Sequence, residues 1–113
     1  MNRVIEDVRD FRTRMKTLAK VEAGVSVEGL LMLLVLVDGP MKMSRVADAL
    51  VVTNGAATNL ADGLVEKGYM RRDRSNDDRR VVNVTLTDSG RKAADAAVAA
   101  YEKAFPASGA ASS

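Results

Sequence analysis

One succession of patterns, between residues 44 and 86, constrains the fold of this chain more than any other feature. Apolar residues at helical spacing predict a short helix over residues 45–50 and a longer helix over residues 54–67. Ser44 and Thr53 stand at the N-cap positions of these two helices, where a hydroxyl can accept a bond from a free backbone N–H group. Because so few residues separate the helices, the pattern predicts a helix-turn-helix unit.

The same stretch continues as a hairpin whose tip is rich in arginine. Residues 69–72 and residues 81–86 have the composition of strands, and a cluster of turn-forming residues lies between them at 75–78. Three arginines fall at or near the tip: Arg74, Arg79 and Arg80. A helix-turn-helix followed by such a hairpin predicts a winged helix, which is an α+β fold that is mostly helical.

The flanking segments predict two further helices, each with an apolar seam. The first seam has alternating spacings of four and three residues: Val4, Val8, Phe11, Met15 and Leu18. Thr87 caps a C-terminal helix over residues 88–105, whose seam comprises Ala94, Val98, Tyr101 and Phe105. Each seam fits either a helix that packs on its own domain or a helix that pairs with a second copy. We expect N- and C-terminal dimerisation helices.

A central helix and a tail complete the predicted domain over residues 1–105. Residues 30–37 are apolar without interruption, which predicts a helix that is buried on all sides, with Ser26 as its N-cap. This run is too short to cross a bilayer, and the N-terminus lacks the apolar core of a signal peptide. We therefore expect a cytoplasmic protein with no membrane partner. Residues 106–113 have little to bury and predict a flexible tail.

Composition narrows the chemistry that is available to this chain. The sequence contains no His and no Cys, which removes imidazole bases, thiolate nucleophiles and the usual zinc ligands. We therefore expect no enzymatic activity, no metal site and no cofactor. The net charge is only +2, yet residues 67–80 alone hold six basic and three acidic side chains. Positive charge is thus concentrated at the predicted hairpin.

The segment LADGLVEKGYMRRDRSNDDRRVVNVTLTDSG, residues 60–90, resembles the MarR family of regulators. The similarity extends from about residue 26 to residue 95, and its most specific parts are LVEKGYMRR and DDRRVVNVTLTDSG. The resemblance implies a homodimeric winged-helix transcription regulator that binds double-stranded, pseudo-palindromic DNA. It also implies a repressor that a small-molecule effector releases.

The start of the second predicted helix supplies the candidates for contact with bases. A helix in the major groove reads base edges with its N-terminal side chains, which here are Asn54, Gly55, Thr58 and Asn59. Asn can bond adenine through two hydrogen bonds, and Thr can contact the methyl group of thymine. Ser44 and Thr53 lie at helix starts, where backbone N–H groups can hold phosphates.

The predicted hairpin supplies the candidates for contact with the narrow minor groove, which attracts arginine. These are Arg72, Arg74, Arg79 and Arg80. Asp78 is expected to pair with Arg80 and orient it, and the resemblance implies the same pairing. Arg71 should point away from Arg72, because neighbouring residues of a strand face opposite sides. Since several Asp residues lie among these arginines, the alternative interpretation is a solvated hairpin with no ligand.

The sequence also departs from the family pattern. No basic residue lies between Asn54 and Glu66, where the family commonly carries Arg, and Gly55 and Gly63 lower the helix propensity of this segment. The chain is short for the family and reaches only one helix beyond the hairpin. An alternative function is therefore a winged-helix module that contacts proteins and has lost DNA binding. Without Cys or His, switching by thiol oxidation or imidazole protonation is excluded.

Overall fold

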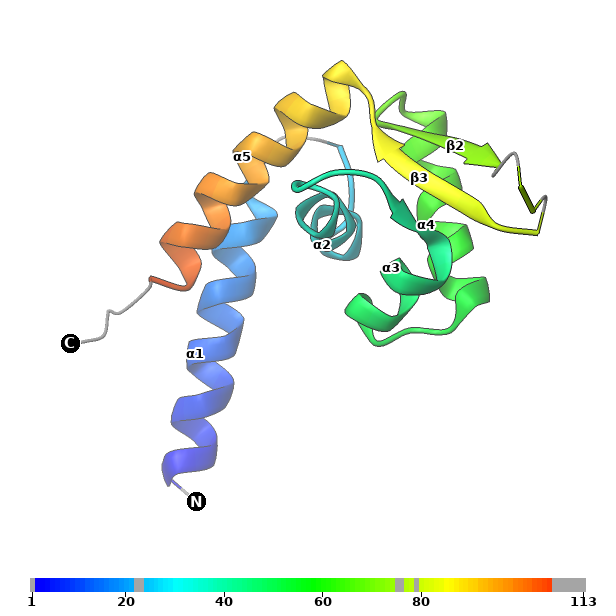
Figure 1. The fold of residues 1–113 in the computed structure, drawn as a ribbon. Helices are drawn as coiled ribbons and strands as arrows, with labels where there is room; N and C mark the ends of the chain where they lie inside the picture. The colour runs from blue at the N-terminus through cyan, green and yellow to red at the C-terminus, as the bar shows by residue number, and fades with distance from the viewer. Residues whose placement is uncertain (1, 22–23, 75–76, 79, 107–113) are drawn as a thin grey trace.

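The structure, a computed structural model, describes residues 2–21, 24–74, 77–78 and 80–106. Its elements are α1 (Asn2–Ala19), α2 (Val27–Val35), β1 (Met41–Lys42), α3 (Met43–Leu50), α4 (Asn54–Glu66), β2 (Met70–Arg74), β3 (Val82–Leu86) and α5 (Asp88–Ala104). Helices α2, α3 and α4 lie beside a small sheet, and α5 leads back from the sheet to lie along α1 (Figure 1). The fold is therefore α+β and mostly helical, as predicted. Residues 107–113, in the predicted tail, lie outside the described residues.

Helix α2 occupies the centre of the core. Ser26 caps it as predicted, by accepting a hydrogen bond from the N–H of Gly29 at 3.2 Å. The helix packs against α3, α4 and α5, so its inward side chains are fully buried: Leu30, Met32 and Leu33. It ends at Val35, which is half-buried, two residues before the predicted end. The expectation of burial on all sides is therefore wrong, because α2 keeps one partly exposed face.

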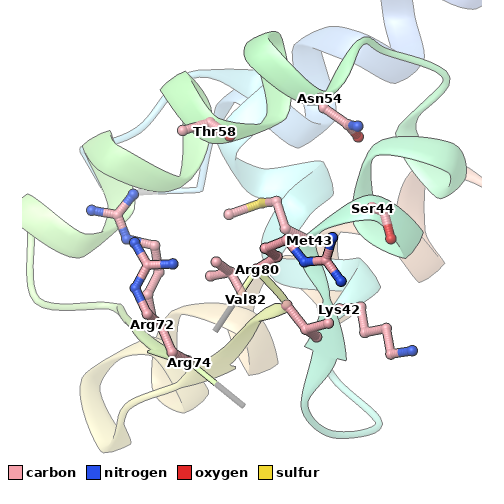
Figure 2. Close-up of a pocket in the computed structure, with 10 residues that line it drawn as sticks. Lys42, Met43, Ser44, Asn54, Thr58, Arg72, Arg74, Arg80 and Val82 are labelled. Carbon is pink, nitrogen blue, oxygen red and sulfur yellow. The ribbon is translucent and has the colours of Figure 1, made fainter. Parts of the chain in front are cut away.

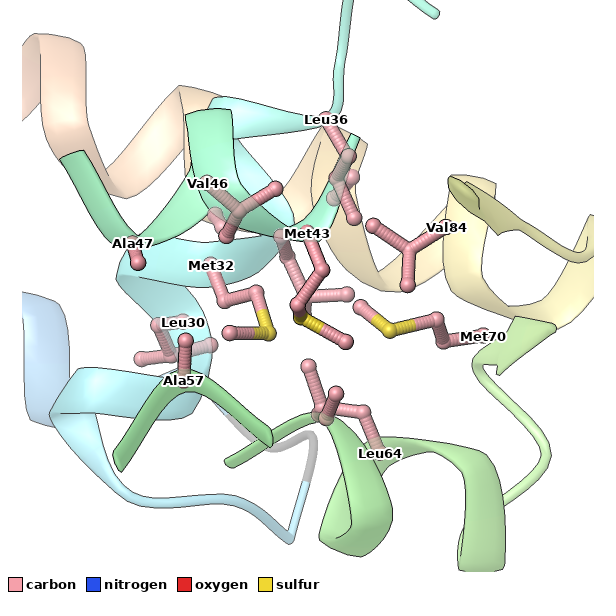
Figure 3. Packing of buried hydrophobic residues seen from close by; sticks show 14 residues of the cluster. Leu30, Met32, Leu36, Met43, Val46, Ala47, Ala57, Leu64, Met70 and Val84 are labelled. Carbon is pink, nitrogen blue, oxygen red and sulfur yellow. The ribbon is translucent and has the colours of Figure 1, made fainter. Parts of the chain in front are cut away.

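Three methionines fill the space where α2, α3 and the sheet meet. The side chains of Met32, Met43 and Met70 point toward one another at the centre of the core (Figure 3). Unbranched thioether side chains adapt to irregular gaps, which suits a junction between helices and a short sheet. This junction holds the helix-turn-helix against the hairpin and so positions the surface described below.

The sheet has the strand order β1-β3-β2, and both pairings are antiparallel. Strands β2 and β3 form the predicted hairpin. Strand β1 was not predicted, because two residues are too few to show an alternating pattern. Within β1, Lys42 pairs with Asn83 of β3 and also occupies the N-cap of α3.

The β1 pairing changes where α3 begins. Met43 directly follows the strand and turns into the core, where it is only 9% exposed, so it is the first residue of the helix. Ser44 consequently lies inside the first turn, and no side chain caps α3. The prediction that Ser44 is the N-cap is therefore wrong. The connection to α4 places Val51 in the left-handed region, at φ 59°, and leaves its side chain 89% exposed.

The hairpin is joined to α5 through a close backbone contact. Thr87 caps α5 as predicted, since its Oγ1 accepts from the N–H of Gly90 at 3.0 Å. The Thr87 N–H donates to the carbonyl of Tyr69 at 3.1 Å, which ties the start of the helix to the start of the hairpin. A Cβ atom at Gly90 would lie 1.8 Å from that same carbonyl oxygen. Only glycine fits at this position, because the first turn of α5 touches backbone.

Helix α1 packs on α5 through its C-terminal half only. Leu18 is fully buried and Met15 is half-buried. Over residues 4–11 of α1, four apolar side chains are each more than half exposed: Val4, Ile5, Val8 and Phe11. The predicted apolar seam of α1 is therefore divided. Its C-terminal part packs against the rest of the chain, and its N-terminal part is uncovered.

Two members of the predicted dimer surface are already covered by the chain itself. Leu18 and Ala94 are 0% exposed, because α1, α2 and α5 pack against one another. The prediction that they contact a second copy is wrong, since they have no surface to offer. Along the rest of the α5 seam, Val98 and Phe105 are half-buried and Tyr101 is 45% exposed. The ring of Tyr101 stacks on that of Phe105, with centroids 5.3 Å apart.

Candidate nucleic-acid interface

Helix α4 is anchored by one face and presents another. Thr53 caps it as predicted, accepting a hydrogen bond from the N–H of Ala56 at 3.1 Å. Its inner face is buried against α2 and α3: Ala57, Ala61 and Leu64. On the side that faces the hairpin, Asn54 and Thr58 line an open cavity (Figure 2). The small inner side chains let α4 pack closely on the core while its N-terminal half stays accessible.

The charged residues of strand β2 lie on two opposite faces of the sheet. Met70, Arg72 and Arg74 alternate along one face, and the two arginines line the same cavity as α4. Arg71 and Asp73 alternate on the opposite face and form an ion pair at 3.3 Å. The expectation that Arg71 points away from Arg72 is thus confirmed.

The cavity has a volume of about 750 Å³ and lies between the helix-turn-helix and the hairpin (Figure 2). Four basic side chains from separate places in the chain line it: Lys42, Arg72, Arg74 and Arg80. Ser44 adds a hydroxyl from the first turn of α3. The wall formed by α4 is polar and uncharged, whereas the wall formed by the strands is cationic. Such a surface fits a polyanion that also offers groups for hydrogen bonding.

Arg80 is held by Asp78, as predicted. Its Nε and Nη2 donate to the two carboxylate oxygens at 3.1 and 3.2 Å, and its backbone N–H donates to Oδ1 at 3.0 Å. The side-chain and backbone hydrogen bonds from Arg80 lower the pKa of Asp78 below its ordinary value of 3.8, although slight burial acts in the opposite direction. Asp78 is therefore ionised at neutral pH and fixes one edge of the guanidinium. Arg79 lies outside the described residues.

Lys42 is the charged residue of the cavity that sequence patterns missed. It lies on β1 and reaches the cavity because β1 pairs with β3, which places it across β3 from Arg72 and Arg74 of β2 (Figure 2). No local signal marks this lysine, since the pairing joins residues about forty positions apart. Tertiary structure therefore brings positive charge to a helix that has no basic residue of its own.

The structure brings together six of the predicted contact residues around this cavity: Ser44, Asn54, Thr58, Arg72, Arg74 and Arg80. Three others do not line it but are exposed beside it on α4 or its cap: Thr53, Gly55 and Asn59. The hydroxyl of Thr53 is engaged in capping, so its backbone position matters more than its side chain.

Within the described residues, no group of three or more His, Cys, Asp or Glu side chains is arranged to hold a metal ion. In the same part of the chain, no helix combines the length and apolar character that spanning a membrane requires.

Comparison with known proteins places the chain in a family. The sequence pattern of the MarR family matches residues 27–82, about half of the chain. The HTH-type transcriptional regulator YpoP of Bacillus subtilis (strain 168) is 38% identical over 55 residues, which is 49% of this chain and 39% of YpoP. The HTH-type transcriptional repressor MdtR of the same organism is 38% identical over 52 residues, 46% of this chain and 34% of MdtR. The chain thus spans well under two thirds of the length of these relatives.

A solved structure extends the match to most of the fold. Streptococcus pneumoniae FabT, in complex with DNA, superposes with a TM-score of 0.70 at 28% identity, over 83% of this chain and 68% of FabT. The family pattern covers the helix-turn-helix and most of the hairpin, and the superposition covers a larger share of the chain. On this agreement of sequence and fold, the chain belongs to the MarR family, which is a family of transcription regulators and not a class of enzymes.

Proposed function

We propose that this chain is a homodimeric regulator of transcription that binds pseudo-palindromic double-stranded DNA and represses by occluding a promoter. The observation that carries the proposal is the cavity between α4 and the hairpin, with four cations on one wall and Asn54 and Thr58 on the other. Asn and Thr side chains at a helix start suit base edges in a major groove, and the cations suit the adjoining phosphates. The structure of the FabT relative in complex with DNA supports DNA binding by this chain.

The binding geometry follows from the positions of these walls. With the N-terminal half of α4 in the major groove, the hairpin reaches the neighbouring minor groove and Arg80 is carried at its tip. The DNA backbone between the two grooves then lies along the cavity. There Lys42, Arg72 and Arg74 neutralise phosphates, and Ser44 donates a hydrogen bond. Two protomers contact half-sites about one helical turn apart, roughly 10 bp.

The uncovered half of α1 supports the homodimer. Val4, Ile5, Val8 and Phe11 form an apolar strip on a helix that extends beyond α5 (Figure 1). Exposed apolar side chains of this number on one helix favour burial against another molecule. Replacing Val8 by Glu should therefore convert the dimer to a monomer in sedimentation equilibrium and weaken DNA binding. A protein that stays dimeric with this change would exclude α1 from the interface.

Control by a small molecule belongs to the same proposal. A second cavity of about 320 Å³ lies between α2 and α5, with an apolar floor that includes Leu34 and Val98. A molecule bound there contacts both α2, at the centre of the core, and α5, which follows the hairpin and packs along α1. Since the chain lacks His and Cys, such an effector acts by binding and not by oxidising a thiol. A regulator of this kind works in the cytoplasm, where chromosomal DNA is found.

Polarisation titrations with labelled duplexes test the proposed function. Duplexes selected from a random pool by the protein should bind in the presence of excess competitor DNA, and the logarithm of the binding constant should fall linearly with the logarithm of the salt concentration. If all four cations of both protomers contact phosphates, the slope should approach about −7. Absence of any competitor-resistant complex at low salt would overturn the proposal, and co-purification of a protein partner would then favour a protein-binding module.

A further inference from the structure

Helix α4 carries a carboxylate on the side that faces the hairpin. Asn54, Thr58 and Asp62 follow one another at spacings of four residues, which places them on one face of the helix. The first two line the cationic cavity. A carboxylate on this face repels DNA phosphates, so its presence on a DNA-contacting helix requires a compensating role.

Asp62 is bound by an arginine of the opposite wall. Nη1 of Arg72, which lines the cavity, donates to Oδ1 of Asp62 and so joins β2 to α4. Both side chains remain partly exposed to solvent, with 39% exposure for Arg72 and 52% for Asp62. Because a guanidinium has five N–H donors in a fixed plane, Arg72 can bond Asp62 and still direct donors to a phosphate.

The ion pair adds a side-chain link between two elements that also contact each other through the short connection from α4 to β2 and through the core. Helix α4 is anchored by Leu64 and its neighbours in the core, and Arg72 lies opposite Val84 in the sheet. Between these anchors, the exposed edges of α4 and β2 face each other. The Asp62–Arg72 pair therefore sets the direction of the Arg72 side chain relative to the helix that carries Asn54 and Thr58.

We propose that Asp62 is a positioning residue for DNA specificity, which holds Arg72 in register with α4 and reduces its attraction to DNA of any sequence. This inference rests on the proposed function. On a matching site, Arg72 contacts its phosphate in the orientation that Asp62 imposes. On other sequences, the negative charge of Asp62 offsets part of the attraction. Asp62 thus increases discrimination by weakening non-specific binding more than specific binding.

The test is Asp62→Asn, which keeps the shape of the side chain and removes its charge. Two duplexes of about 30 bp serve as probes: the tightest sequence that the wild-type protein selects from a random pool, and a scrambled sequence of the same composition. The variant should bind the scrambled duplex about fivefold to tenfold more tightly at low salt, with a salt slope that is steeper by about one for each protomer. Affinity for the selected duplex should not rise, so the ratio of the two affinities falls.

Two variants serve as controls. Asp73→Asn removes a carboxylate of similar exposure from the opposite face of β2, where it pairs with Arg71 outside the cavity, and should leave the affinity ratio within about twofold of wild type. Asp62→Glu retains the charge and can still reach Arg72, so it should keep the affinity ratio and the salt slope near wild type.

The outcomes separate this inference from the proposed function. If wild type discriminates between the duplexes and Asp62→Asn leaves both the ratio and the salt slope unchanged, the role of Asp62 is refuted and the proposed function stands. A variant that loses affinity for both duplexes equally and melts at a lower temperature would show a purely structural role, which also refutes the inference. If wild type binds neither duplex, the proposed function and the inference fail together.

Discussion

Helix α4 and the β2–β3 hairpin form the two walls of one cavity, yet they are stabilised and charged in opposite ways. The helix is anchored by buried side chains, Leu64 foremost, and contains no basic residue. In the hairpin, β2 is exposed apart from Met70 and β3 is half-buried apart from Val84, which is buried, and the hairpin carries the arginines. Each of Arg71, Arg72 and Arg80 also forms an ion pair with an aspartate.

This contrast indicates that the two walls have different roles in DNA binding. A rigid helix without basic residues can read bases without adding affinity for every sequence, because phosphate attraction is the sequence-independent part of DNA binding. The cationic hairpin supplies that attraction. Asp78 of the hairpin and Asp62 of α4 orient the arginines that they bind and limit the attraction, so affinity depends on the hairpin and discrimination depends on the helix.

The largest effect is expected where the helix is anchored. Leu64→Ala removes a side chain that is 2% exposed in the core, and should lower the free energy of unfolding by about 2–5 kcal/mol in urea denaturation. Val82→Ala, at a half-buried position of the hairpin, should cost about 1 kcal/mol or less. Equal losses for the two variants would contradict the view that the walls are stabilised differently.

Two glycine-to-alanine substitutions compare two sites. Gly90 lies where α5 meets the hairpin, and Gly63 lies on the exposed side of α4. Gly90→Ala should destabilise by about 1–3 kcal/mol, because its Cβ would lie 1.8 Å from the Tyr69 carbonyl oxygen. Gly63→Ala has open space within 4 Å and should stabilise α4 by about 0.5–1 kcal/mol. Melting temperatures should move in opposite directions, and a shared direction would refute the packing described at Gly90.

Substitutions on the two walls should affect DNA binding in different ways. Arg80→Ala should weaken binding to all duplexes by a similar factor and make the salt slope shallower by about one for each protomer. Asn54→Ala should leave the slope unchanged and reduce discrimination at one base pair of each half-site by about 1–3 kcal/mol. Polarisation titrations against single-base variants of a selected duplex measure both effects. If Arg80→Ala lowered the DNA affinity by factors that differ between sequences, the proposed roles of the two walls would be contradicted.

The smallest effect is expected from pH. The pKa of Asp78 is lowered in the folded protein, so its ion pair with Arg80 contributes at pH values above the unfolded pKa of about 3.9 and is lost as the pH falls through the folded value. That window lies below pH 4, and the sequence contains no His. DNA affinity at constant ionic strength should therefore vary by less than about twofold between pH 6 and pH 7.5. A larger change would require a titrating group at the interface other than Asp78.

Local signals in the sequence predicted the parts of the site that depend on residues close together in the chain. Ser26, Thr53 and Thr87 each cap the helix that their position predicts, because a cap joins residues three positions apart. The Asp78–Arg80 pair was predictable for the same reason. Where a distant pairing intervened, prediction failed: Ser44 lost its capping position because β1 pairs with β3.

The helix seams show a different limit. A repeat of four and three residues predicts an apolar stripe, but the same stripe fits contact within the chain and contact with a second copy. The structure assigns Leu18 and Ala94 to contact within the chain and leaves Val4, Val8 and Phe11 uncovered. The period alone does not predict which part of the stripe is covered, because the covered part depends on how far α5 extends along α1.

By itself, the sequence determined the helix-turn-helix, the arginine-bearing hairpin, their caps and the family resemblance, since each depends on spacing along the chain. Only the tertiary structure decided that Lys42 joins the arginines beside a helix without basic residues, and that Arg72 is bound to Asp62. Both results require β1, β2 and α4 to meet in space. Electrostatic interactions act through distance in space, so the charge around the cavity follows from the packing of elements and not from their order.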